Sequence, residues 1–437
     1  MKKKIENATF WEKRTERLLY MAKIILQSVL FQGKTQDVLI SGKKFAKVGG
    51  TLSARDYDKA EVINCKGLAI VPPFYNGHTH AAMTLLRGYA DDMPLQKWLQ
   101  EYIWPFEAKL TAKDIEIGSR LAVLEMIKSG TVFFSDMYWR REVTMKVVRE
   151  MGIRAAIGVT IAENLDSPEH IEENFKFLQD HRYENDRVKL AVMPHSIYTV
   201  GEKIFKRCAK VAVAENYVLH THLSETLTEI KDCKKQYGCS PVELLAKWNV
   251  LGDHMVAAHC VHLSEYDMSL MAESGSAAIL NPCSNLKLGS GIPKVNALLD
   301  SGMLVGLGTD GASSNNNLDM HEEMKLISLL AKVEPKTGKA DSLPAEETLK
   351  LATSNPALAY GIPAGVIAEG FLADALLLDL KNERLVPNHN LVSNWVYAAD
   401  SSAIHSVICN GKFVMKNRHV DGEEEILKDA QKIAKKS

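Results

Sequence analysis

Short apolar runs alternate with longer amphipathic segments between residue 69 and about residue 365. The amphipathic segment over 114–128 places apolar residues at i, i+3, i+4 and i+7 and ends at Ser129-Gly130, as helices do. The apolar runs have the length of buried strands. Eight of them follow one another, over 68–77, 130–137, 153–160, 188–195, 217–222, 255–260, 276–281 and 304–310. This alternation predicts a (β/α)₈ barrel, with a doubly wound open sheet as the alternative.

Both ends of the chain carry further strand-like runs, over 24–31, 37–43, 375–380 and 407–413. Neither end is long enough to be a convincing domain alone, so we expect the two to pair into one small β-sandwich beside the barrel. The predicted domains are 1–68 and 366–437 for the two parts of the sandwich and 69–365 for the barrel. The charge-rich residues 1–17 predict a loosely held helix or tail.

Composition excludes several classes of partner. The chain has 437 residues, of which 46% are apolar, and its 53 basic side chains nearly balance its 54 acidic ones. Neither nucleic acid nor a membrane surface is therefore an expected partner, and a small neutral molecule is. The 7 cysteines are scattered, without a Cys-x-x-Cys pair, as in reduced cytoplasmic proteins. No signal peptide or membrane-spanning run is predicted, so we expect a cytoplasmic protein.

Polar side chains end several of the predicted strands, and the active sites of (β/α)₈ enzymes lie at these ends. His78 and His80 are two residues apart, so both face the same side of a strand. His222 and Asp310 end two later runs. Together these four supply the imidazole and carboxylate ligands that zinc takes at catalytic sites, where one position stays open for water. The fourth run ends in His195 rather than in a bridging lysine, which favours a single metal.

Two further residues have the chemistry that a metal-activated water needs. Such a water has a pKa of about 7 and still requires a proton acceptor. Glu225 leaves the same strand as His222 and is predicted to be that acceptor, the alternative being a surface acid at a helix start. His259 is predicted to orient the water or stabilise the intermediate, the alternative being a hydrogen-bonded core histidine. Glu225, His259 and the ligand Asp310 are the predicted catalytic residues.

Short motifs in a fixed order surround these residues. They are Asn76-Gly-His-Thr-His80, Leu85-Leu-Arg-Gly88, Trp104-Pro-Phe-Glu107, His220-Thr-His-Leu-Ser-Glu225, His259-Cys-Val-His262, Asn281-Pro-Cys-Ser-Asn-Leu-Lys-Leu-Gly289 and Gly308-Thr-Asp-Gly-Ala-Ser-Ser-Asn315. From about residue 20 to its end, the chain resembles the amidohydrolase superfamily. Within it, the chain is most similar to the methylthioadenosine/S-adenosylhomocysteine deaminase and chlorohydrolase branch.

The resemblance implies a (β/α)₈ barrel with a flanking β-sandwich, and one zinc, or less often iron, per subunit at the four predicted ligands. Glu225 would shuttle protons and His259 would assist. The implied reaction is hydrolytic deamination of an aminated purine carbon in a nucleoside, with release of ammonia. The resemblance also suggests a homo-oligomer, either a dimer or a tetramer.

The resemblance further implies the contacts to the substrate. Glu107 corresponds to a glutamate that holds the ribose hydroxyls, His195 to a histidine that contacts the nucleoside, and Ser314 to a serine that contacts the base. Trp104 belongs to the same motif as Glu107 and is predicted to contact the substrate too. These matches favour an adenosine-type nucleoside over a free base or a triazine, although Glu107 could be only a helix-face acid and His195 only a strand-end cap.

Departures from the family pattern bear on the substrate. Members that accept S-adenosylhomocysteine tend to carry two arginines where this chain has Val159 and His170. Arg140 and Arg141 could substitute for them. Methylthioadenosine, adenosine or a related derivative is therefore favoured. A second departure, Pro72-Pro73 in place of Pro-Gly, is expected to alter only the local backbone.

Other functions stay open on the same scaffold. A guanine-type deaminase or a triazine chlorohydrolase would share the metal ligands, and Glu107 and His195 discriminate against both. A catalytically silent, metal-binding barrel is the remaining alternative. Glu225 and His259 argue against it, since a purely structural metal needs neither.

Overall fold

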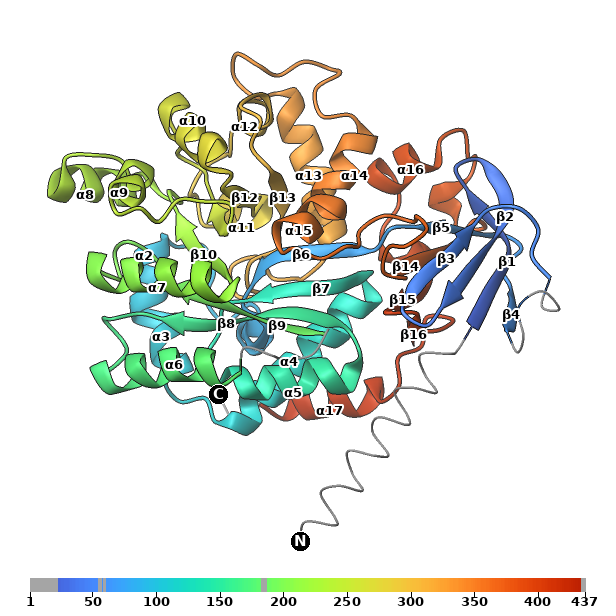
Figure 1. Ribbon diagram of the computed structural model, residues 1–437, viewed down its shortest axis with the longest axis horizontal. Coiled ribbons are helices and arrows are strands. Elements are labelled where there is room, and N and C mark those ends of the chain that lie inside the picture. Colours follow the sequence, from blue (N-terminus) through green and yellow to red (C-terminus); the bar gives the residue numbers. More distant parts are fainter. Residues whose placement is uncertain (1–22, 54–56, 58–59, 182–186, 434–437) are drawn as a thin grey trace, which may run out of the picture.

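A nearly closed barrel of eight parallel strands forms the larger part of the molecule, with helices around its outside (Figure 1). The computed structural model describes residues 23–53, 57, 60–181 and 187–433. The strands follow one another in chain order around the barrel, which confirms the predicted (β/α)₈ architecture. They are β6 (Phe74–Thr79), β7 (Thr131–Asp136), β8 (Arg154–Ile161), β9 (Val188–Pro194), β10 (Val218–Leu223), β11 (Met255–His259), β12 (Ala277–Leu280) and β13 (Val305–Leu307).

The first and last strands of the barrel meet directly. The backbone N–H of Asp310 donates to the carbonyl of His78 at 2.9 Å. Gly308 makes this approach possible, because a Cβ at this position would lie 2.6 Å from the backbone nitrogen of His78. The closure therefore places the residues that follow β13 beside the end of β6.

The helices cover the barrel and form its rim. A capping box at Thr111 and Asp114 starts α4, and its buried face carries the predicted apolar stripe. None of the helices in the described residues is long and apolar enough to cross a membrane. The helices that follow the barrel strands are α4 (Ala112–Lys128), α5 (Arg141–Met151), α6 (Pro168–Asp180), α7 (Glu202–Glu215), α8 (Leu227–Tyr237), α9 (Pro241–Lys247), α10 (Glu265–Ser274), α11 (Pro282–Lys287), α12 (Val295–Asp300), α13 (Met320–Lys332), α14 (Ala345–Ala352) and α15 (Ser354–Ala359).

Shorter helical segments complete the chain. Between β6 and α4, a stretch at the rim contains η1 (Ala81–Leu86), α2 (Leu95–Lys97), η2 (Trp98–Ile103) and α3 (Trp104–Glu107). After the barrel come η3 (Glu383–Leu385), α16 (Leu391–Tyr397), η4 (Ser401–Ala403) and α17 (Glu423–Ile433), and α17 packs back against α4.

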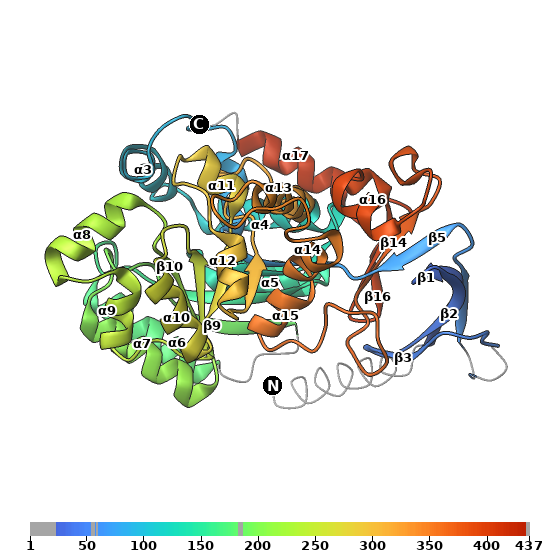
Figure 2. The ribbon, with the colours of Figure 1, turned by 90° about the horizontal axis from the view of Figure 1, so that it is seen from above.

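The two ends of the chain share a separate mixed sheet beside the barrel (Figure 2). Its two halves join where β5 runs antiparallel to β14, with Val71 opposite Leu376. This confirms that the flanking sheet is built from both ends, while the charge-rich residues 1–17 lie outside the described residues. The strands of the sheet are β1 (Lys23–Phe31), β2 (Lys34–Ser41), β3 (Lys44–Val48), β4 (Glu61–Asn64), β5 (Leu68–Val71), β14 (Ala375–Asp379), β15 (Ile404–Cys409) and β16 (Lys412–Met415).

The first apolar run is divided rather than continuous. Its first half, β5, belongs to the terminal sheet, and its second half, β6, opens the barrel. Pro72 and Pro73 lie between them, and since proline has no N–H to offer a ladder, pairing stops there. The prediction of a single strand over 68–77 was therefore wrong. The chain passes from one sheet to the other at these prolines, and the domain limits of 68 and 365 stay a prediction.

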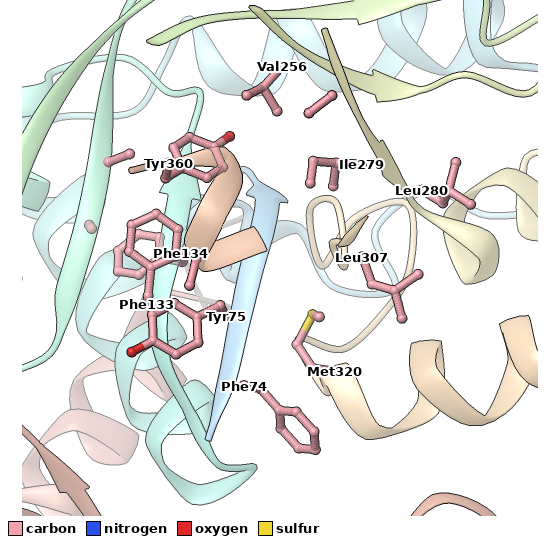
Figure 3. Packing of buried hydrophobic residues seen from close by; sticks show 14 of the residues in the cluster. Phe74, Tyr75, Phe133, Phe134, Val256, Ile279, Leu280, Leu307, Met320 and Tyr360 are labelled. Carbon is pink, nitrogen blue, oxygen red and sulfur yellow. The ribbon is translucent and has the colours of Figure 1, made fainter. Parts of the chain in front are cut away.

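Large apolar side chains from the barrel strands and from the helices around them pack into one core (Figure 3). The ring of Phe133 lies 5.7 Å from that of Tyr75 and 5.1 Å from that of Tyr360, measured between centroids. The Tyr360 hydroxyl donates to the carbonyl of Gly77 at 2.7 Å, which satisfies the polar end of a fully buried ring. This packing lies beneath His78 of β6 and supports it.

A buried ion pair joins the barrel to the terminal sheet. Arg154 on β8 donates to the Asp374 carboxylate at 3.0 Å, and both side chains are almost wholly buried. The hydroxyl of Tyr75 donates to the other oxygen of Asp374, and the amide oxygen of Asn410 accepts from Arg154 at 2.9 Å. Each charge is thus paired and hydrogen-bonded, as burial requires.

Candidate active site

Two of the predicted ligand histidines have their Nδ1 atoms fixed by backbone carbonyls. Nδ1 of His80 donates to the carbonyl of Met137 at 2.6 Å, and Nδ1 of His222 donates to the carbonyl of His195 at 2.8 Å. A carbonyl can only accept, so each neutral ring keeps its lone pair on Nε2. Both lone pairs are therefore available to a cation.

His78 and Asp310 complete the group. Nε2 of His78 is buried without a hydrogen-bond partner, and it lies 3.4 Å from Oδ1 of Asp310. Nε2 of His80 lies 3.2 Å from the same oxygen. The ligand atoms of His78, His80 and Asp310 are close enough together to share one metal ion, and those of His78 and His222 are too. An orphaned buried nitrogen amid other ligand atoms fits a divalent metal.

The charges of these groups agree with a cation site. Burial lowers the pKa of His78 to about 4 and that of His222 well below its usual range, so both rings are neutral at pH 7, as ligands must be. Burial also opposes charge on His80, but the Asp310 carboxylate outweighs it and raises the pKa of His80 to about 9, so without a metal Nε2 of His80 carries a proton at pH 7 that a bound cation would displace. Asp310 therefore attracts positive charge to the point where the nitrogens converge.

Two serines hold the other oxygen of Asp310. Ser284 on α11 donates to Oδ2 at 2.6 Å, and Ser314 donates to the same atom at 2.9 Å. Oδ1 is thus the oxygen left for a cation. Ser314 lies behind Asp310 and does not line the cavity next to it, and its contact with a base stays a prediction. Its hydroxyl orients the carboxylate.

Glu225 points into the site from the turn after β10. Its Oε1 accepts from the Ser290 hydroxyl at 3.0 Å, and its Oε2 lies 3.8 Å from Nε2 of His259. Burial raises the pKa of Glu225. The turn itself is held by Glu229 on α8, whose carboxylate accepts the backbone N–H groups of Ser224 and Glu225, both at 2.8 Å. The site thus contains a carboxyl group suited to taking and returning a proton.

His259 is distinguished from the ligand histidines by its partner. The Asn285 side-chain amide donates to Nδ1 of His259 at 2.9 Å. Nδ1 is therefore the acceptor, and the ring proton sits on Nε2, which faces Glu225. Although His259 lies near His78 and His222, an Nε2–H group is a donor and not a ligand. It can donate to an oxygen that gains negative charge during a reaction.

The backbone is strained where three strands end at the site. Ser224, His259 and Asp310 have φ values of 53°, 73° and 63°, in the left-handed region that residues other than glycine rarely adopt. Each such residue costs about 1–3 kcal/mol and is typical of functional sites. The turns direct the side chains of His259 and Asp310 toward the space next to Glu225.

A cavity opens next to this cluster. The predicted substrate contacts Trp104, Glu107 and His195 line it, together with His80, His222, Glu225, His259 and Asp310. Oε1 of Glu107 is buried and accepts no hydrogen bond from the described residues, and burial raises the pKa of Glu107 to about 7. Burial also lowers the pKa of His195 to about 3, so this ring is neutral. A polar ligand would satisfy the free carboxyl oxygen.

An outer cavity of about 640 Å³ shares Trp104 and Glu107 with the first. Arg140 lines it at the start of α5 and is exposed. Arg141 lines it too, but it donates to Asn174 at 2.7 Å and stacks 4.0 Å above the ring of Phe177. Arg141 is therefore already committed to contacts within the protein.

Neither of the two positions that depart from the family pattern carries a positively charged side chain free to bind a substrate carboxylate. Nδ1 of His170, on the wall of the outer cavity, is 2.7 Å from the Asp166 carboxylate, and Val159 is buried within β8.

Comparisons with known proteins agree with this geometry. Residues 69–414 match the Amidohydrolase family. The chain is 42% identical over 388 residues to a 5-methylthioadenosine/S-adenosylhomocysteine deaminase of Halothermothrix orenii, covering 88% of this chain and 89% of that protein. It is also 42% identical to a 5'-deoxyadenosine deaminase of Methanospirillum hungatei, covering 97% and 95%. Among solved structures, an adenosine deaminase from Xanthomonas campestris with bound zinc superposes with a TM-score of 0.89 at 30% identity, covering 95% of this chain and 98% of that one.

Proposed function

The chain belongs to the Amidohydrolase family, and we propose that it is a metal-dependent hydrolytic deaminase of an adenosine-type nucleoside. The reaction replaces the amino group of the purine with oxygen and releases ammonia. The observation that carries the proposal is the pairing of Glu225 and His259. A proton-accepting carboxyl and an Nε2–H donor face each other at 3.8 Å beside the metal ligands. A structural metal site would need neither group.

We assign one zinc ion per subunit to His78, His80, His222 and Asp310, with iron as the second choice. The fit rests on the orphaned Nε2 of His78 and on the lone pairs that the Nδ1 contacts of His80 and His222 leave free. When bound there, the ion would lower the pKa of a water molecule to about 7 and so supply a nucleophile at neutral pH.

Side chains of the protein then transfer the protons of the reaction. As the water oxygen bonds to the purine carbon, Oε2 of Glu225 takes its proton and passes it to the adjacent ring nitrogen. Nε2–H of His259 donates to the oxygen as negative charge develops on it. The second proton of the water goes to the amino group. The carbon–nitrogen bond breaks, ammonia leaves, and the ring keeps a carbonyl.

Glu107 and His195 favour a nucleoside over a free base. The unsatisfied oxygen of Glu107 is placed to accept from the ribose hydroxyls, while His195 and Trp104 line the same cavity. The 5' group would then extend toward the outer cavity, where Arg140 is the one arginine not committed to a contact in the described residues. One free arginine stands here in place of the two that members accepting S-adenosylhomocysteine tend to carry, so small or uncharged 5' groups, as in 5'-methylthioadenosine, 5'-deoxyadenosine and adenosine, should be preferred to S-adenosylhomocysteine.

Ammonia release by the zinc-loaded protein tests the proposal. The substrates are 5'-methylthioadenosine, 5'-deoxyadenosine, adenosine, S-adenosylhomocysteine, guanine and a chlorotriazine, the last followed by chloride release. We expect turnover of the first three above all. Turnover of guanine or of the triazine alone would replace the nucleoside assignment with that activity. If protein with full metal content released neither ammonia nor chloride from any of these substrates, the proposal would be overturned. Gel filtration of the same sample tests the predicted dimer or tetramer.

A further inference from the structure

A fourth histidine lies behind the ligand histidines and forms a hydrogen bond with one of them, His78. His220 precedes His222 by two residues on β10, and its side chain is wholly buried. Its Nε2 lies 2.8 Å from Nδ1 of His78, and its Nδ1 lies 2.8 Å from the carbonyl oxygen of Val256 on β11. The ring therefore links the backbone of one strand to a ligand side chain of another.

These two contacts determine which ring nitrogen carries the proton in His220 and in His78. The carbonyl of Val256 can only accept, so Nδ1 of His220 carries the proton. In a neutral ring Nε2 of His220 is then an acceptor, and Nδ1 of His78 must be the donor. His78 consequently has its lone pair on Nε2, the buried atom that lies 3.4 Å from Asp310.

We infer that His220 is a positioning residue that holds His78 in the tautomer and orientation needed to bind the metal. The inference rests on the proposed function. The Nδ1 atoms of His80 and His222 are instead held by hydrogen bonds to backbone carbonyls, which no substitution can remove. Among the three ligand histidines, His78 is the one whose Nδ1 depends on a side chain in the described structure. The ability of His78 to bind a metal is therefore sensitive to the residue at position 220.

Tyr360 anchors the far side of His220. Its hydroxyl donates to the Gly77 carbonyl at 2.7 Å and lies 3.4 Å from Nδ1 of His220. The hydroxyl oxygen can therefore share the Nδ1 proton with Val256, and both groups favour the same tautomer. Gly77 precedes His78 on β6. The Tyr360 hydroxyl therefore contacts both the ring of His220 and the backbone next to His78.

Substitution of His220 tests the inference through metal affinity. His220→Leu removes the acceptor, whereas His220→Gln offers an amide oxygen near the place of Nε2. The control is His321→Gln, which alters another buried histidine bonded to a backbone carbonyl, that of Trp395. The dissociation constant for zinc is measured by competition with a chelator, alongside the thermal unfolding of the metal-free proteins.

We expect zinc to bind about 10- to 100-fold more weakly to His220→Leu, the usual effect of losing the partner of a ligand histidine. His220→Gln should recover part of the loss, and His321→Gln should bind as the wild type does. A folded His220→Leu protein with wild-type affinity would overturn the inference. So would equal losses in His220→Leu and His321→Gln.

A measurement on the unaltered protein keeps the test independent of folding. ¹⁵N spectra of the histidine-labelled protein report which ring nitrogen carries a proton. His220 should carry its proton on Nδ1, with a coupling across the hydrogen bond from Nδ1 of His78. A His220 proton on Nε2 would overturn the inference. Failure of the wild type to bind zinc, or to release ammonia when loaded, would instead overturn the proposed function.

Discussion

Ser284 donates its hydroxyl to Oδ2 of Asp310 at 2.6 Å, from a short helix that the chain reaches immediately after β12. Ser314 donates to the same oxygen, so one face of the carboxylate is occupied before any ligand binds. The two hydroxyls decide which oxygen Asp310 presents to the site.

Removing these hydroxyls should weaken metal binding. Without them Oδ2 is free to rotate toward the histidines, and the preorganisation of Asp310 is lost. We expect Ser284→Ala with Ser314→Ala to bind zinc about 10- to 100-fold more weakly, and each single variant to lose less. Chelator competition measures the effect, and Ser269→Ala, which alters a half-buried serine bonded to Glu273, is the control. Wild-type affinity in the double variant would contradict the assigned role.

Glu225→Gln should separate chemistry from metal binding. The amide keeps the size of the side chain and can still contact Ser290, but it cannot take up a proton. We expect a fall in kcat of roughly 10²- to 10⁴-fold, the usual contribution of a positioned acid–base group, with full metal content. Ammonia release and elemental analysis of the same sample check both parts. Retained activity with metal bound would remove Glu225 from the mechanism.

Glu107 should give the KM a dependence on pH. Burial raises its pKa to about 7, so the carboxyl is neutral below this pH and charged above it. A carboxylate accepts hydrogen bonds from two ribose hydroxyls more strongly than a neutral acid does. The KM for a nucleoside should therefore fall as the pH rises through about 7.

The matched variant Glu107→Gln should raise the KM and abolish this inflection. A Glu107→Gln protein whose KM still changes near pH 7 would show that another group titrates.

Acidification should remove metal and activity together. The three histidine ligands bind a metal only when they are neutral, so protons compete with the ion as the pH falls. We expect the bound zinc, measured after rapid desalting at each pH, to follow the loss of ammonia release. Loss of activity at full metal occupancy would point to a different titrating group.

The ion pair between the barrel and the terminal sheet should contribute strongly to stability. Asp374→Ala removes the carboxylate that pairs with the buried Arg154, and breaking a buried ion pair typically costs about 3–5 kcal/mol in the free energy of unfolding. Urea unfolding at pH 7 measures it, with Asp253→Ala as the control because that side chain is exposed. A change below about 0.5 kcal/mol, typical of surface positions, would mean that Arg154 finds another partner.

The barrel could be predicted because its signal is repeated and local. Each buried strand is an apolar run, and His78, His222 and Asp310 each follow or end such a run, where parallel strands converge. The split of the first run was missed because β5 is as apolar as β6. Its partner is a strand near the other end of the chain. Which strands pair with each other depends on tertiary structure, and a local sequence pattern does not contain this information.

The supporting residues could not be predicted for a related reason. Ser284, Asn285, Glu229 and His220 act on side chains or N–H groups that other turns and strands bring to them. Serine, asparagine and glutamate are common at helix starts, so their presence there carries little information. For His220 a signal did exist, since it shares a face of its strand with His222.

The pairing of β5 with β14 has a consequence for synthesis on the ribosome. The partner of Val71 is Leu376, so the N-terminal half of the terminal sheet leaves the ribosome roughly 300 residues ahead of the strand that completes it. At the usual speed of translation, about 5–20 residues per second, this delay is about 15 to 60 s. During that time β5 has an open edge and Tyr75 lacks its partner Asp374. The nascent chain is therefore exposed to association with other chains at this edge until its last strands emerge.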